Sequence, residues 1–189
     1  MVTTVIRRFA RAVCTALLVL GAPSSACAQP EPLATSASEV RASPISVEHQ
    51  YLHVRAESAA GRVLIEDVFK RSPTFRGLVD RVERSTIVIY VRLGACRSRS
   101  AACLDYVGTA AALTYLRATL DHFNRSPATL AGLLAHEVYH ALEVAEARVN
   151  SADEFRRFLD RNARQTTAGY ETDNARVIGR RVEDELIGR

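Results

Sequence analysis

The chain has 189 residues, of which 48% are apolar and 24% charged, enough for one domain with a substantial core. Its formal net charge of +4 comes mainly from three arginines in the first 28 residues. Subtracting them from the 25 basic residues leaves 22, against 21 acidic ones. This near-neutral balance excludes a strongly basic protein, and it does not indicate nucleic acid or an anionic membrane as a partner.

Residues 1–28 have the pattern of a cleaved secretory signal peptide. An apolar run at 12–20 follows the positive start, and Ala26-Cys27-Ala28 fits the small-x-small pattern that signal peptidase recognises. The apolar run is too short to span a bilayer comfortably. We therefore expect an exported bacterial protein, periplasmic or secreted, with no stable membrane span after removal of the leader. Acylation of Cys27 is the weaker alternative, because Ser24 stands where a lipoprotein signal has a large aliphatic residue.

After the leader, residues 29–45 are rich in Pro, Ser and Ala and contain few large apolar side chains. This composition predicts a flexible lead-in. The remaining residues, 46–189, are predicted to form a single domain. Of the 189 residues, 161 follow the signal peptide.

Two helices are predicted at the start of the domain. Apolar residues recur at helical spacing between 59 and 71. A second helix begins at Ser72, a favourable N-cap, followed by Pro73 at the first helical position. One apolar stripe runs along this second helix: Phe75, Leu78, Val79 and Val82.

The pattern then changes to strands. Residues 86–92 are mostly β-branched or aromatic, and residues 111–120 alternate in a way that suits a second strand. We expect these strands to form a hairpin, with Cys96 and Cys103 at its base or in its long loop. Two cysteines in an exported protein predict a disulfide, which would stabilise the fold by roughly 2–3 kcal/mol. Free or metal-binding thiols are the alternative.

Three further helices complete the predicted order. Ser126 and Pro127 repeat the N-terminal signal and begin a helix that runs to about residue 148. Shorter helices follow at 152–163 and 170–188. Helices, a β-hairpin or small sheet, and more helices indicate an α+β domain.

The long helix contains the sequence H-E-x-x-H, as His136, Glu137 and His140. Residues four apart share a helix face, so both imidazoles can reach one zinc ion. Glu137 projects about 100° away, where a general base can hold a water molecule without binding the metal. The surrounding residues are apolar, and buried polar side chains need partners. The sequence therefore predicts one zinc ion per chain, the alternative being hydrogen-bonded core histidines.

A catalytic zinc takes three protein ligands, so a third is required. Glu146 occupies the position of the last ligand in the longer motif H-E-x-x-H-x-x-G-x-x-H. That motif needs a glycine where this chain has Glu143, and a downstream methionine where this chain has none beyond Met1. These two differences exclude the long motif.

A carboxylate from a later helix is the other solution. Glu154 borders the apolar stripe of its helix and Asp160 lies off that stripe. Glu171 is predicted to head the apolar face of the last helix, where a carboxylate is costly without a partner such as a metal. We select Glu171 as the third ligand; its alternative role is a helix-entry glutamate favoured by the helix dipole. The face that it heads continues with Ala175, Ile178, Val182 and Leu186.

The stretch "LLAHEVYHALEVAE", preceded by strands and followed by "YETDNARVIGRRVEDEL", resembles the zincin superfamily of zinc metallopeptidases, and within it exported bacterial proteins of unassigned specificity. The glutamate-ligand, thermolysin-like branch implies His136, His140 and Glu171 as ligands and Glu137 as base. It also implies an acidic residue four positions after the ligand glutamate, where this chain has Ala175. Glu143 could support a ligand histidine instead, although a surface role for it is as consistent with the sequence.

The same resemblance implies a substrate peptide in extended conformation, paired with the edge strand of a sheet. "STIVIYVR" or "LTYLRATL" would be that strand. An electrophilic group that stabilises the oxyanion is also implied, and Tyr170, Tyr106 and Arg180 are candidates to which no role is assigned. His122, His49 and His53 are not predicted to be ligands.

The sequence thus predicts an exported zinc metallopeptidase that hydrolyses peptide bonds, with Glu137 as general base. Two alternatives stay open. One is a catalytically inactive zincin-like protein that binds zinc or a partner. The other is a metal-free extracytoplasmic binding domain stabilised by its disulfide.

Overall fold

The computed structural model describes residues 52–97, 100–162, 164–166 and 169–188. All of them belong to one compact unit, Pro44–Arg189. The predicted signal peptide at 1–28, the lead-in at 29–45 and His49 lie outside the described residues. None of the helices in the described part of the chain is long and apolar enough to cross a membrane.

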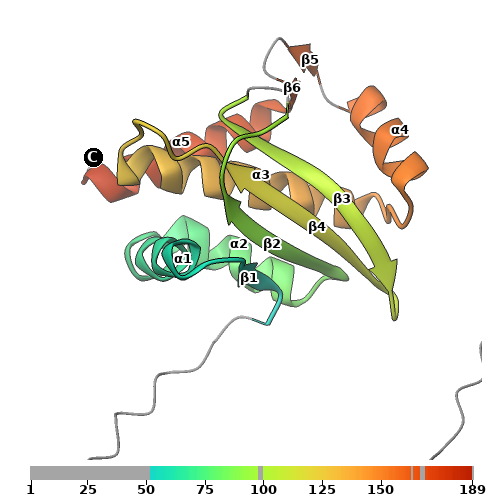
Figure 1. Cartoon of the computed structure of the whole chain (residues 1–189), viewed down its shortest axis with the longest axis horizontal. Coiled ribbons are helices and arrows are strands. Elements are labelled where there is room, and N and C mark those ends of the chain that lie inside the picture. Colours follow the sequence, from blue (N-terminus) through green and yellow to red (C-terminus); the bar gives the residue numbers. More distant parts are fainter. Residues whose placement is uncertain (1–51, 98–99, 163, 167–168, 189) are drawn as a thin grey trace, which may run out of the picture. The chain divides into compact units, whose positions relative to one another are not determined.

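The described chain has the predicted α+β architecture, with five helices, a four-stranded sheet and a two-stranded sheet (Figure 1). The elements follow in this order: β1 (Val54–Ala56), α1 (Ala59–Arg71), α2 (Pro73–Glu83), β2 (Ile87–Leu93), β3 (Ala102–Ala110), β4 (Leu113–Leu120), α3 (Pro127–Glu146), α4 (Ala152–Asn162), β5 (Arg164–Thr166), β6 (Gly169–Glu171) and α5 (Asp173–Ile187). The predicted helices are all present. Four short or irregular strands were not predicted: β1, β3, β5 and β6.

Serine and threonine caps fix where the helices begin. The Ser72 hydroxyl accepts a hydrogen bond from the Phe75 amide at 2.9 Å, and that of Ser126 accepts one from the Thr129 amide at 3.1 Å. Both caps precede a proline, as the sequence predicts. Thr172 caps α5, so this helix begins at Asp173 rather than at 170.

The order of strands in the large sheet is β1-β2-β4-β3, and it contradicts the predicted hairpin. The segment 86–92 (β2) lies parallel to 111–120 (β4), so the two cannot form a hairpin. β4 instead forms an antiparallel hairpin with β3, which lies at the edge of the sheet. Ala111 and Ala112 make the turn in the left-handed region, with φ of 50° and 64°.

The predicted pairing of Cys96 with Cys103 is consistent with the structure, because the two sulfurs lie at bonding distance, 2.18 Å. Cys96 follows β2, and Cys103 is the second residue of β3. Since β4 lies between β2 and β3 in the sheet, the disulfide joins the edge strand to the segment that follows β2.

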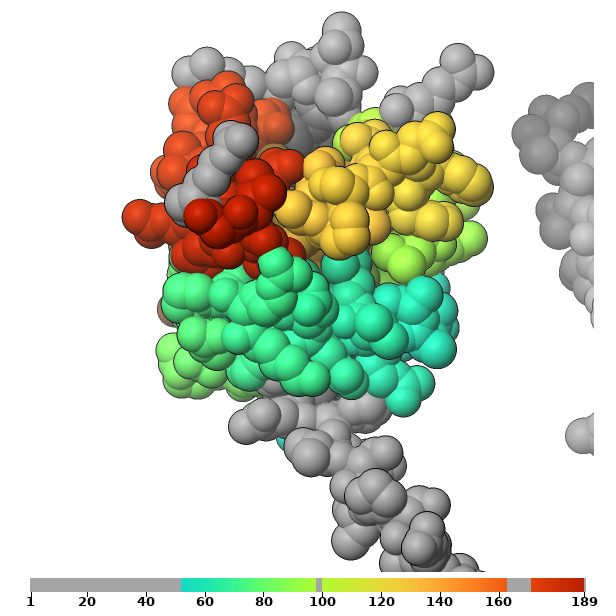
Figure 2. Space-filling view, turned by 90° about the vertical axis from the view of Figure 1, so that its left-hand side faces the viewer, coloured from blue at the N-terminus to red at the C-terminus, as the bar shows by residue number. Residues whose placement is uncertain are grey.

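The core lies between the sheet and the helices. The fully buried residues of β4 alternate along the strand, whereas those of β2 include three in a row, Ile87, Val88 and Ile89, and both strands contact α3. The helix α5 makes its most extensive contact with α3, and it also reaches α1, where the Arg71 guanidinium donates to the carbonyl of Leu186. Figure 2 shows α5, in red, directly against the N-terminal helices, in green.

Two glycines allow α3 and α5 to approach closely. A Cβ atom built on Gly132 would lie 2.9 Å from the Gly179 carbonyl oxygen, and one built on Gly179 would lie 2.9 Å from the Gly132 carbonyl oxygen. The Gly179 Cβ would also lie 3.3 Å from the Cβ of His136. This crossing was not predicted from the sequence.

Hydrogen bonds also join α5 to the start of α2. The carboxylate of Glu185 accepts hydrogen bonds from the Ser72 hydroxyl and from the Thr74 hydroxyl, the latter at 2.5 Å. Burial alone would raise the pKa of Glu185, but these hydrogen bonds and the nearby charge of Arg181 lower it. Glu185 is therefore stabilised in its ionised form by the folded structure.

Candidate metal centre

Helix α3 carries His136 and His140 one turn apart on the same face. It continues without interruption from Pro127 through both histidines. Their Nε2 atoms lie 3.1 Å apart. Because residues four apart share a helix face, this convergence follows directly from the spacing in the sequence.

Glu171 completes a cluster with these histidines. It is the last residue of β6 and precedes the cap of α5, whereas it was predicted to lie on the helix itself. Its Oε1 atom lies 3.5 Å from Nε2 of His136. The three ligand atoms, one each from His136, His140 and Glu171, all lie within 4.8 Å of one another. The structure therefore brings the three predicted ligands together.

Two of the three ligand-atom separations in this cluster suit a zinc ion, and the third is at most 4.8 Å. Tetrahedral bonds of 2.0–2.1 Å separate neighbouring ligand atoms by about 3.3–3.4 Å, and the separations of 3.1 and 3.5 Å lie on either side of that value. Oε1 of Glu171 is buried and has no hydrogen-bond partner among the described residues. A carboxylate oxygen in this state is costly unless a cation contacts it. Two imidazoles and one carboxylate also form a typical donor set of catalytic zinc.

Glu143 contacts one histidine of the cluster and the residue that follows Glu171. Its Oε2 lies 2.8 Å from Nδ1 of His140, and its Oε1 accepts a hydrogen bond from the Thr172 hydroxyl at 3.0 Å. This contact leaves Nε2 of His140 directed toward His136. Of the two roles that the sequence left open for Glu143, the structure thus agrees with the support of a ligand histidine. Thr172 was not identified from the sequence.

The two histidines differ in their electrostatic surroundings. Burial and the neighbouring His140 lower the pKa of His136 to about 4, although a hydrogen bond to the backbone of Ala175 opposes this shift. Burial also acts to lower the pKa of His140, but the hydrogen bond with Glu143 and the charge of Glu137 raise it overall. His136 is therefore neutral near pH 7, the form that binds a metal ion.

Glu137 is 4% exposed and lies in the same cavity as the cluster. Burial raises its pKa to about 7, and the charges of Glu171 and Asp105 act in the same direction while His140 opposes them. Burial also raises the pKa of Glu171. A carboxyl group with a pKa close to neutral can both accept and return a proton, as a general base must.

The other acidic candidates lie outside the cluster. Glu146 forms an ion pair with Arg81 at 2.8 Å, and Glu154 accepts a hydrogen bond from the amide of Asn150 at 2.9 Å. Asp160 is exposed. In the parts of the chain that the structure describes, His136, His140 and Glu171 are the one group with suitable geometry for a metal ion.

Among the candidates without an assigned role, the Tyr106 hydroxyl donates to the carbonyl of Asn150 at 3.0 Å. Arg180 is exposed. His53 contacts the carbonyl of Val82, and His122 stacks on Phe123. Tyr170 lies in β6, but its side chain is outside the described part of the structure. Among these candidates, the described side chains form no hydrogen bond or ion pair with His136, His140 or Glu171.

The cluster opens into a cavity of about 600 Å³ between β3, α3 and α4. The cavity is lined by residues 100–106, by His136, Glu137 and His140, by the apolar side of α4 and by Glu171. We call this cavity the cleft. Its size lies in the usual range of ligand pockets.

The edge strand beside the cleft is β3, and neither of the two predicted edge segments has this position. "STIVIYVR" contains β2, which lies between β1 and β4, and "LTYLRATL" is β4, which lies between β2 and β3. The carbonyl of Ala101 accepts a hydrogen bond from the amide of Asp121, at the end of β4, at 2.9 Å. Since backbone direction alternates along an antiparallel strand, the backbone groups of Ala102, Leu104 and Tyr106 face away from β4.

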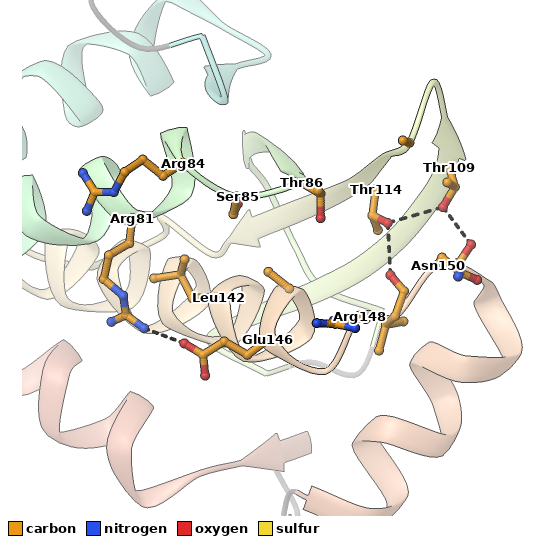
Figure 3. Close-up of a pocket in the computed structure, with 13 residues that line it drawn as sticks. Arg81, Arg84, Ser85, Thr86, Thr109, Thr114, Leu142, Glu146, Arg148 and Asn150 are labelled. Atoms are coloured by element: carbon orange, nitrogen blue, oxygen red, sulfur yellow. Dashed lines mark hydrogen bonds and ion pairs between the residues drawn. The ribbon is translucent and has the colours of Figure 1, made fainter.

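A second cavity of about 850 Å³ lies at the C-terminal end of α3. It contains no histidine, and its Glu146 carboxylate is paired with Arg81 (Figure 3). Its hydroxyls bind the linker between α3 and α4: Thr114 donates to the carbonyl of Val149 and Thr109 to that of Asn150. The larger cavity is thus separate from the candidate catalytic residues.

Comparisons with protein-family models, with curated proteins and with solved structures found no match for this chain. The resemblance to zincins therefore stays a prediction from the motif. The geometry of the cluster provides the remaining argument about function.

Proposed function

We propose that this protein is a zinc-dependent peptidase. The observation that carries the proposal is the convergence of His136, His140 and Glu171 beside the buried carboxyl group of Glu137 in one cleft. Metal ligands, a general base and space for a substrate therefore occur together. Histidines that only formed hydrogen bonds in a core would need neither the base nor the space.

Each residue of the site would have its own role in the reaction. A zinc ion held by His136, His140 and Glu171 would supply Lewis acidity, polarising a carbonyl group and lowering the pKa of water. Glu137 would accept the proton of the attacking water and return it to the amine that leaves. Glu143 would hold His140 in the orientation that the ligand needs.

The edge of β3 would position the substrate. Backbone groups of Ala102, Leu104 and Tyr106 face away from β4, and these residues line the cleft. An extended peptide could add to β3 through main-chain hydrogen bonds, which would orient it independently of its sequence. In this proposal β3 takes the substrate-binding role that the sequence suggested for "STIVIYVR" or "LTYLRATL".

The decisive experiment compares the wild-type protein with Glu137→Gln. We expect about one zinc ion per chain in both, because Glu137 is not a ligand. Peptide hydrolysis should fall at least 100-fold in the variant, since proton transfer by a positioned base contributes about 10²–10⁴-fold, and a chelator should abolish it in the wild type. A metal-free protein whose stability does not change with chelator would contradict the proposal.

A zinc-binding protein that holds peptides without hydrolysing them is the second candidate. The favouring observation concerns the side chains of the cleft that could stabilise an oxyanion. Both such side chains are engaged elsewhere, because the Tyr106 hydroxyl donates to the Asn150 carbonyl and Arg156 is paired with Asp153. Neither is therefore placed to stabilise an oxyanion, as hydrolysis would require. If wild type and Glu137→Gln bind zinc equally and neither hydrolyses any peptide in a mixed library, this second function is supported instead.

A further inference from the structure

We infer that the second cavity, at the C-terminal end of α3, binds a phosphate group, either as the free ion or on a small organic molecule. Arg84 and Arg148 would bind the phosphate oxygens. The cavity shares no lining residue with the cleft, so the inference does not depend on the proposed peptidase function.

The lining of the second cavity has an excess of positive charge. Its charged residues are three arginines and one glutamate, which gives a formal net charge of +2: Arg81, Arg84, Arg148 and Glu146. The C-terminal ends of α2 and α3 also lie there, and each contributes a partial charge of about −0.5. These helix ends offset about half of the excess, so the cavity still favours an anion.

In the described structure, a protein carboxylate neutralises one of the three arginines. Arg81 donates to Glu146 at 2.8 Å, and its guanidinium also lies over the ring of Tyr139, 5.7 Å from the centroid. The guanidinium groups of Arg84 and Arg148 form no hydrogen bond or ion pair with any residue that the structure describes. Since a guanidinium presents several N–H donors that match phosphate oxygens, two sets of donors are available to a ligand.

The two unpaired arginines come from different segments of the chain. Figure 3 shows Arg84, with Arg81, at one side of the cavity and Arg148, with Asn150, at the other. The Thr86 hydroxyl and the Asn150 side-chain amide also line the cavity and have no hydrogen-bond partner in the described part of the chain. These uncharged groups suit the hydroxyls of an organic phosphate. The volume of about 850 Å³ lies in the range of pockets for small molecules.

Arg148 occupies a backbone position that normally favours glycine. Its φ is 54°, in the left-handed region, and it ends α3 in a Schellman motif. In this motif the Arg148 amide donates to the Ala145 carbonyl at 3.0 Å, and the Val149 amide donates to the Val144 carbonyl at 3.2 Å. A Cβ atom makes this conformation unfavourable, and residues held in it concentrate at functional sites. An arginine in place of the more stable glycine therefore indicates a role for its guanidinium.

The backbone that follows Arg148 is fixed by the β3–β4 hairpin. The Thr114 hydroxyl donates to the carbonyl of Val149 at 3.0 Å, and the Thr109 hydroxyl donates to that of Asn150 at 2.8 Å. These bonds hold the linker between α3 and α4 in place before any ligand binds. A preformed site loses less conformational entropy on binding, which favours affinity.

The test is isothermal titration of the purified full chain with inorganic phosphate, glucose 6-phosphate and glucose. We expect both phosphates to bind with a Kd of about 1 mM or lower and glucose to bind at least tenfold more weakly. Tighter binding of glucose 6-phosphate than of inorganic phosphate would identify an organic phosphate as the ligand, and the reverse order would identify the free ion. If neither phosphate binds at about 10 mM, or if glucose binds as tightly as its phosphate, the inference is wrong.

Two substitutions assign the binding to this cavity. Arg84→Gln and Arg148→Gly should each weaken phosphate binding at least tenfold, because each removes charge-assisted hydrogen bonds. Arg148→Gly should also raise Tm by about 3–4 °C, since glycine adopts the left-handed backbone without strain. A residue that only stabilised the fold would not combine a gain in stability with a loss of binding.

Arg62→Gln is the matched control, because Arg62 is exposed on α1 and does not line the cavity. It removes the same charge and should leave phosphate affinity unchanged. Equal weakening in all three variants would mean that phosphate responds only to the net charge of the protein. Unchanged binding in Arg84→Gln and Arg148→Gly would mean that phosphate binds elsewhere, such as at a metal ion, and either result would overturn the inference.

Discussion

Glu143 connects the two parts of the chain that form the metal cluster. Its carboxylate contacts Nδ1 of His140 on α3 and accepts a hydrogen bond from Thr172, the residue next to Glu171. Loss of the partner that orients a ligand histidine commonly weakens metal binding by about 10–100-fold. We therefore expect Glu143→Ala to lower zinc affinity by this factor, measured by competition with a chromophoric chelator.

Two matched variants test this role of Glu143. Glu146→Ala removes a carboxylate from the same helix that is paired with Arg81 and lies outside the cluster, so zinc affinity should not change. Glu143→Gln keeps an oxygen acceptor at the same position and should recover part of the affinity. Equal zinc affinity in Glu143→Ala and the wild type would show that the contact with His140 is incidental.

The residues of the cluster differ in how far sequence predicted them. His136, Glu137 and His140 follow from local helix geometry, because their spacing alone places them. Glu171 was selected for the cost of burying a carboxylate; it precedes the helix, and its Oε1 is buried without a hydrogen bond, 3.5 Å from Nε2 of His136. The Thr172–Glu143 contact joins residues 29 apart, and no local pattern encodes it.

At the scale of elements, the close crossing of α3 and α5 sets the distance between the histidines and Glu171. In Gly179→Ala the new methyl group would lie 2.9 Å from the Gly132 carbonyl and 3.3 Å from Cβ of His136, so the helices must separate. We expect zinc affinity to fall about tenfold or more, as for other changes that displace a ligand. Isothermal titration with zinc would measure the change.

The control for this crossing is Gly77→Ala on α2, where an added Cβ meets nothing within 4 Å. Alanine is the better helix former, so this variant should keep its zinc affinity and gain up to about 1 kcal/mol of stability. The double variant Gly179→Ala with Glu171→Ala tests whether the helix crossing affects zinc affinity through the position of Glu171. If the crossing acts through Glu171, adding Gly179→Ala to Glu171→Ala should cause little further loss of affinity.

Helices were easier to predict than strands, for local reasons. The Ser-Pro caps at Ser72 and Ser126 and the apolar stripes that follow them are contained in short windows of sequence. The hairpin was missed because its turn is Ala111–Ala112 and lacks the Asn-Gly signal of such turns. Strand β3 combines Asp105 and Gly108 with few β-branched residues, so its composition does not indicate a strand.

At the scale of the whole molecule, Glu185 makes stability depend on pH. Its folded-state pKa is lowered, so its contribution is present above the ordinary value of 4.5 and is lost as the pH falls through the lower folded value. Glu185→Gln should cost about 1–2 kcal/mol at pH 7, because two hydroxyls lose a charged acceptor.

Urea unfolding of both proteins between pH 7 and pH 3 would measure this contribution. The difference between wild type and Glu185→Gln should narrow as the pH falls below 4.5. Asp184→Asn, an exposed change one residue earlier in the same helix, should leave the curve unaltered. A constant difference across the range would mean that packing, rather than ionisation, accounts for the effect of Glu185.

The α+β class of the molecule was predictable, but the arrangement of its sheet was not. Composition and periodicity distinguish helices from strands, whereas strand order depends on contacts between distant segments. Here β2 and β4 pair in parallel, and the intervening β3 passes to the far side of β4. The edge beside the cleft therefore belongs to the strand whose sequence indicates it least.

The turn between β3 and β4 offers a way to engineer a more robust background for these experiments. Two alanines in the left-handed region are strained, and Asn-Gly suits this turn better. Ala111→Asn with Ala112→Gly should add about 1 kcal/mol and raise Tm by about 4 °C in differential scanning calorimetry.

Ala110→Gly, at the end of β3, should destabilise instead, because glycine weakens a strand. Ala111 and Ala112 do not line the cleft. A protein with this redesigned turn could therefore tolerate costly substitutions at buried site residues such as Glu137, and a loss of zinc or activity could be separated from a loss of folded protein.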